Sequence, residues 1–182
     1  MSIDIPDVDR ATADGLLRSV FFQFVFTDPA PLHVVMLLAT SHFSRLRGSR
    51  SHTIDLLQLR GMAIREINSA LADDIRGTSD QVIAAVSSMA SYEALFGDRA
   101  ICNTHMQGLT RMVSLRGGLP ALGLDGLLER IILWIDSNVS HIINTHRYFD
   151  EFAFPPSAPH VGHPPPDLTS FAGGGISRQV SI

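Results

Sequence analysis

Apolar residues recur every three or four positions along most of the chain, which is typical of helices that bury one face. These stripes predict five helices: one that starts at Pro29, three over residues 53–74, 82–96 and 124–146, and one between Gly97-Asp98 and Gly117-Gly118. The segment 82–96 is apolar or small nearly all round, so we expect it at the centre of the fold. The pattern predicts an all-α protein, a packed array of about five helices. The first of these helices covers residues 29–47, and its predicted inward face consists of Leu32, Val35, Met36, Ala39, Phe43 and Leu46.

Several short motifs predict where helices begin and end. Asp28-Pro29 combines an N-cap residue with a proline at the first helical position. Thr78 and Gln81 match a capping box, with Thr78 as the N-cap of the central helix. Gly117-Gly118 supplies the left-handed conformation that ends the fourth helix. Residues 20–26 fit two structures, because their β-branched and aromatic content suits a strand and their length also fits a buried helix.

The composition divides the chain into three parts. Residues 1–14 alternate acidic and small residues, and we expect a flexible arm. Residues 15–154 carry the helical patterns and form one regulatory-type domain. Residues 155–182 are rich in proline and glycine, a composition that cannot close a core, so we expect a disordered C-terminal tail.

Charge and residue usage argue against several functions. All 14 basic residues are arginines, and 18 acidic residues give a net charge of −4, so this chain has no general attraction to nucleic acid. Without lysine it has no phosphate-binding loop, and its single cysteine excludes a disulfide framework or a cysteine-rich zinc module. Its apolar runs are too short for a membrane helix. We expect no cofactor, no metal and no membrane partner.

Candidate chemistry gathers around the predicted fourth helix. Cys102 and His105 lie one turn apart, the spacing of a nucleophile and its base, although a buried histidine beside an inert thiol fits the same pattern. Gly61 and Gly108 lie inside predicted helices, where either a close neighbouring helix or a ligand groove would explain them. A small-molecule effector would find an adaptable apolar pocket between the third, fourth and fifth helices, lined by Met89, His105, Met112 and Trp134.

The residues of the fourth helix also resemble a known family. The segment 105–119 reads His-Met-Gln-Gly-Leu-Thr-Arg-Met-Val-Ser-Leu-Arg-Gly-Gly-Leu, and it follows Ala84-Ala85-Val86 and Glu93-x-x-Phe96-Gly97-Asp98. Together with Asp28-Pro29-Ala30 and Trp134-Ile135-Asp136, these motifs are similar to the fungal-specific transcription factor domain, the helical regulatory region of fungal zinc-cluster regulators. The resemblance implies an all-helical fold, a role in transcription regulation, a nuclear location (otherwise cytoplasmic) and effectors or protein partners.

Two departures from that family shape the expected function. The six-cysteine zinc cluster is absent from this sequence, and the family's helical region usually continues past the point where this chain becomes proline-rich. We therefore expect a truncated regulator that acts through a protein partner or self-association, with apolar residues such as Ile132, Trp134 and Ile143 left uncovered. Arg111 or Arg116 could hold an acidic group of a partner. A small-molecule sensor, an enzyme using Cys102 and His105, and an inert gene product remain alternatives.

Overall fold

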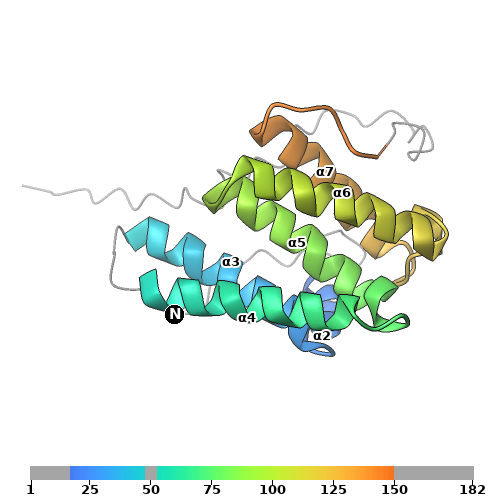
Figure 1. Cartoon of the computed structure of the whole chain (residues 1–182), viewed down its shortest axis with the longest axis horizontal. Coiled ribbons are helices and arrows are strands. Elements are labelled where there is room, and N and C mark those ends of the chain that lie inside the picture. Colours follow the sequence, from blue (N-terminus) through green and yellow to red (C-terminus); the bar gives the residue numbers. More distant parts are fainter. Residues whose placement is uncertain (1–16, 48–52, 150–182) are drawn as a thin grey trace, which may run out of the picture. The chain divides into compact units, whose positions relative to one another are not determined.

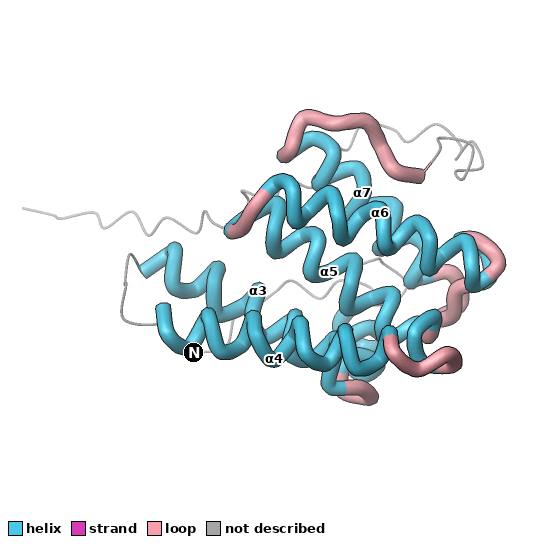
Figure 2. Tube along the Cα trace, viewed as in Figure 1, coloured by secondary structure: helices cyan, strands magenta, loops and turns pink. Residues whose placement is uncertain are grey.

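The computed structural model describes residues 17–47 and 53–149, and helices dominate them (Figures 1 and 2). No strand occurs among these residues, which confirms the all-α prediction. The predicted arm and the predicted tail lie outside the described residues. The elements in chain order are η1 (Leu17–Phe21), α2 (Phe22–Val25), α3 (Pro29–Arg47), α4 (Thr53–Leu71), η2 (Arg76–Thr78), α5 (Asp80–Phe96), α6 (Arg99–Arg116), η3 (Leu119–Ala121) and α7 (Leu127–Ile142).

Helix α5 is the centre of the array, as its all-round apolar pattern predicts. It packs against α3, α4, α6 and α7 (Figure 1). Every residue from Val82 to Ala90 is buried. Small side chains make this possible, because Ala84, Ala85 and Ala90 allow neighbouring helices to approach closely. Helices α4 and α6 both lie against α5 but make few contacts with each other.

Most predicted helix boundaries hold to within a few residues. Asp28 caps α3, since its Oδ1 accepts the N–H of Ala30 at 2.8 Å. The predicted N-cap of α5 was wrong by one residue. Thr78 belongs to η2, and Ser79 is the N-cap of α5, where its hydroxyl accepts the N–H of Val82 at 3.4 Å. The predicted partner Gln81 instead contacts Thr27.

The end of α6 follows the predicted glycine signal. Gly117 has φ +106°, and it donates to the carbonyl of Ser114 while Gly118 donates to that of Val113. This pair of hydrogen bonds is a Schellman motif. The predicted start of the last helix at residue 124 was wrong, because Leu124, Asp125 and Gly126 all have positive φ and α7 begins only at Leu127.

The ambiguous segment at residues 20–26 is helical, which excludes the strand alternative. It continues η1 into the single turn of α2 and then bends into α3. Within the described ranges, no single helix is long and apolar enough to cross a bilayer. Ser19–Val25 and Pro29–Arg47 meet that criterion only as a pair, and the chain bends by 112° between them.

Candidate functional site

The structure distributes the four residues predicted to line an effector pocket over three helices. Met89 on α5 is fully buried, and Met112 on α6 is nearly so. His105 on α6 is half-buried, whereas Trp134 on α7 is 41 % exposed. A pocket made of these four residues stays a prediction.

Cys102 lacks the environment of a catalytic nucleophile. Its side chain is fully buried and its Sγ donates to the carbonyl oxygen of Ala90 at 3.3 Å. Burial and the nearby Glu93 carboxylate raise the pKa of the Cys102 thiol to about 11, so the thiol stays protonated at neutral pH. Burial also lowers the pKa of His105, and the charges of Glu93 and Arg60 act on it in opposite directions. This setting suppresses thiolate formation.

A buried ion pair joins α4 to α5 beside these residues. Arg60 donates from both Nε and an Nη to Oε1 of Glu93, at 2.9 and 2.7 Å, and the Glu93 side chain is 1 % exposed. The other oxygen, Oε2, accepts the backbone N–H of Asp98 at 3.0 Å. A Cβ at Gly97 would overlap Oε2 and lie 2.8 Å from Glu93 Cδ. The Glu93-x-x-Phe96-Gly97-Asp98 motif therefore positions the α5–α6 turn around a buried carboxylate.

Arg111 and Arg116, proposed to hold a partner's acidic group, have different surroundings. Arg111 is exposed on α6. Arg116 forms an ion pair with Asp80 at 3.5 Å, and Asp80 also accepts the N–H of Gly123. Arg116 therefore already has an acidic partner within the chain.

A second buried carboxylate, Asp136, holds the start of the segment after α7. No pattern in the sequence predicted this role. Asp136 is 1 % exposed and accepts the backbone N–H groups of Tyr148 and Phe149, at 3.0 and 3.2 Å. Burial raises the pKa of Asp136, and these hydrogen bonds oppose the shift. The Tyr148 hydroxyl donates to Asn103 on α6. The family-like Trp134-Ile135-Asp136 motif thus anchors the chain that follows α7.

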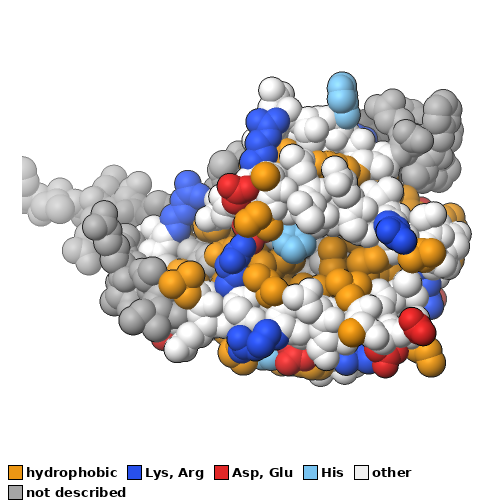
Figure 3. Space-filling view, in the orientation of Figure 1, with side chains coloured by type: hydrophobic (Ala, Val, Ile, Leu, Met, Phe, Trp, Pro, Cys, Tyr) orange, Lys and Arg blue, Asp and Glu red, His pale blue; other side chains and the backbone are white. Residues whose placement is uncertain are grey.

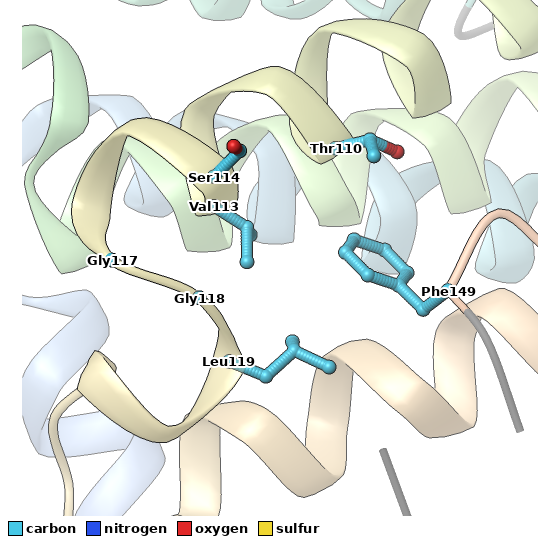
Figure 4. Close-up of a pocket in the computed structure, with 7 residues that line it drawn as sticks. All are labelled: Thr110, Val113, Ser114, Gly117, Gly118, Leu119 and Phe149. Atoms are coloured by element: carbon cyan, nitrogen blue, oxygen red, sulfur yellow. The ribbon is translucent and has the colours of Figure 1, made fainter. Parts of the chain in front are cut away.

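A shallow pocket of about 560 Å³, wide open to solvent, lies between the end of α6, η3 and the segment anchored by Asp136 after α7, residues 143–149 (Figure 4). The side chains of Val113, Leu119 and Phe149 point toward its middle, and none of the four predicted effector residues lines it. Thr110 and Ser114 contribute hydroxyl groups, but the Thr110 hydroxyl already donates to the carbonyl of Met106. The pocket is an apolar hollow without a charged side chain in its lining.

The residues expected to be uncovered on the last helix are mostly buried. Ile132 and Ile143 are 0 % and 5 % exposed, so that part of the prediction was wrong, and only Trp134 is exposed. Helix α7 packs against α5, and the segment that follows it folds back to Ser140 and Asp136, so little of the helix is left uncovered. The close-packing explanation for Gly108 was also wrong, since a Cβ there would meet nothing within 4 Å, and at Gly61 it would meet only the Arg65 guanidinium.

An apolar band lies instead between α4 and α6, over α5 (Figure 3). On α4, Leu57, Ile64 and Leu71 repeat every seven residues on the side from which Arg60 reaches α5. Leu57 and Leu71 are 65 % and 46 % exposed. On α6, the side that carries His105 also carries Ile101, Gly108 and Met112. We call the surface formed by Leu57, Ile64, Leu71, Ile101, His105 and Met112 the α4–α6 groove.

A second apolar surface lies on the face of α3 that was predicted to pack inward. The orientation predicted for this helix was therefore wrong. The residues that pack against α4 and α5 are Ala30, Pro31, Val34, Leu37, Ser41 and Ser44. Met36, Phe43 and Leu46, which were predicted to face inward, are 45 %, 47 % and 56 % exposed. The reason is that small side chains let α3 approach its neighbours closely, so the bulkier stripe faces outward. We call Leu32, Met36, Ala39, Phe43 and Leu46 the α3 stripe.

Comparison with known proteins identifies the family. A search of curated proteins and a search of solved structures each found no match. The family model of the fungal specific transcription factor domain matches residues 11–169, which includes all the helices described above. The match covers most of the chain, and its range includes the motifs at Glu93–Asp98 and in α6. The chain therefore belongs to the fungal specific transcription factor domain family.

Proposed function

We propose that this chain is a non-enzymatic regulatory module of a transcription regulator and that it acts by binding a helix of a partner protein in the α4–α6 groove. Membership in the family supports the transcriptional role and, with it, a nuclear location. The inert setting of Cys102 supports a function without catalysis.

The exposed apolar side chains of the groove carry the proposal. Leu57 and Leu71 remain largely accessible although the chain has a well-filled core around α5. Contiguous apolar surface of this kind is typical of interaction sites. The groove lies between two helices that rest on a third, and an amphipathic helix placed there would pack on both walls. Gly108 in the α6 wall leaves open space that a side chain of the partner could fill.

The test is a reporter assay with the whole chain fused to a heterologous DNA-binding domain. We expect the fusion to change reporter expression relative to the DNA-binding domain alone, and we expect a Leu57→Ser/Leu71→Ser variant to lose that effect. Ile142→Ser is the matched control, because Ile142 is 40 % exposed but lies on α7. Exposed substitutions of this kind change stability by only about 0.5 kcal/mol, so the variants should remain folded.

Two outcomes would overturn the proposal. One is a wild-type fusion with no effect on the reporter at an expression level equal to that of the control. The other is a groove variant that keeps the full effect while its circular dichroism spectrum matches that of the wild type.

A further inference from the structure

The α3 stripe has the spacing of a helix that pairs with another helix. Met36 and Phe43 lie seven residues apart, Leu32, Ala39 and Leu46 repeat with the same period, and together they occupy the a and d positions of two heptads. Since α3 buries its opposite face against α4 and α5, this seam is free of both neighbours. The bulky members Met36, Phe43 and Leu46 are each about half exposed.

We propose that the α3 stripe is a second docking surface, independent of the α4–α6 groove, and that its occupant is an acidic amphipathic helix of a partner protein. Charged side chains at e and g, the positions that flank a heptad seam, determine which partner helix binds. In α3 they are held by His33, Val35, Thr40, His42 and Arg47. Helix α3 contains no acidic residue, so every ionisable side chain that α3 itself places beside the seam is a base.

Arg47 is placed to receive a carboxylate. Its guanidinium lies over the Phe43 ring, 4.2 Å from the ring centroid, so it is held beside the seam at an exposed position. A glutamate at a flanking position of the docked helix would pair with this guanidinium while a leucine of the same helix covers Phe43.

Charge complementarity excludes a second copy of this chain as the preferred occupant. In a parallel pair of α3 helices, His42 of one copy would face Arg47 of the other. In an antiparallel pair, Arg47 would approach the N-terminal end of α3, where Asp28 already pairs with Arg76 at 2.8 Å. Neither arrangement offers a free carboxylate from α3 to Arg47.

The test uses the full chain and two synthetic three-heptad peptides, both with leucine at a and d. One peptide carries glutamate at e and g and the other carries lysine there. We expect the glutamate peptide to bind about tenfold more tightly by fluorescence anisotropy, and high salt to reduce the difference. Arg47→Glu should remove or reverse the preference. Phe43→Ser should weaken both peptides, whereas Leu57→Ser in the α4–α6 groove should change neither.

Several results would overturn the inference without touching the proposed function. Equal affinity for the two peptides would refute the acidic partner, and a loss caused by Leu57→Ser equal to that caused by Phe43→Ser would place the peptide in the groove. Dimerisation at tens of micromolar that Phe43→Ser abolishes, measured by sedimentation, would make a second copy the occupant. Phe43-dependent binding to phosphatidylserine vesicles would make it a lipid surface. The reporter assay above tests the groove and is unaffected by these outcomes.

Discussion

Gly97 lies directly against the Glu93 carboxylate of the buried ion pair, so Gly97→Ala tests how firmly that carboxylate is held in place. The new Cβ would overlap Glu93 Oε2, so the carboxylate would have to move. Only 1 % of the Glu93 side chain is exposed, so the carboxylate is stabilised by its protein partners and not by solvent. Moving it would break the hydrogen bond from Asp98 and disturb the two from Arg60.

The size of the effect follows from leaving a buried charge without its partners. Disrupting a buried ion pair costs about 3–5 kcal/mol, and Arg60 is 29 % exposed, so we expect the lower end of that range, about 3 kcal/mol. For a chain of this size, such a loss lowers Tm by roughly 6–12 °C. Urea unfolding followed by circular dichroism measures the difference directly.

Two further variants make the result specific. Gly108→Ala is the matched control, because its Cβ would meet nothing within 4 Å, and alanine should stabilise the helix by about 0.5–1 kcal/mol. In a Glu93→Ala background, Gly97→Ala should cost much less, because the overlapping carboxylate is gone. If Gly97→Ala costs less than about 1 kcal/mol in the native sequence, Glu93 moves aside cheaply and the tight arrangement inferred here is wrong.

Three further predictions concern titration, reactivity and capping. Burial lowers the pKa of His105 below its ordinary 6.5, so the unfolded chain binds this proton first and stability should fall as pH drops through 6.5. His105→Gln should reduce that loss, measured as the difference between the urea midpoints at about pH 7.5 and 5.5. An equal difference for the variant and the wild type would contradict the assignment. Cys102 should react with iodoacetamide only after denaturation, because its thiol is buried and its pKa is about 11; fast labelling of the native protein would argue for an accessible thiolate. Ser79→Ala should cost about 0.5–1 kcal/mol by loss of the long cap bond, while Thr78→Ala should cost less; the reverse order would restore Thr78 as the cap.

The helices themselves could be predicted from the sequence because their signals are local. Apolar spacing, caps and glycine stops lie within a few residues of the structure they specify, and α5 could be placed at the centre because it lacks a polar face. Helix α3 shows the limit of that approach. It has two faces with heptad spacing, and periodicity alone does not say which one packs inward.

The buried charges could not be predicted because their partners are distant in sequence. Glu93 meets Arg60 across 33 residues, and Asp136 accepts from backbone N–H groups 12 and 13 residues further on. A motif such as Glu93-x-x-Phe96-Gly97-Asp98 shows only that these residues are close in sequence and near a helix end. Which carboxylate is buried, and what neutralises it, depends on packing between helices.

The buried carboxylates and the exposed side chains of the two apolar surfaces should affect different properties of the protein. Glu93 and Asp136 are buried, whereas Leu57 on α4 and Phe43 on α3 are exposed. Because an exposed side chain contributes little to folding, changes at Leu57 or Phe43 should alter binding without altering stability. Gly97→Ala should do the opposite. It should lower stability while leaving the side chains of the α4–α6 groove and the α3 stripe unchanged. A Leu57 or Phe43 variant that lowered the free energy of unfolding by more than about 1 kcal/mol would show that this side chain belongs to the core, and the argument for a docking site there would fail.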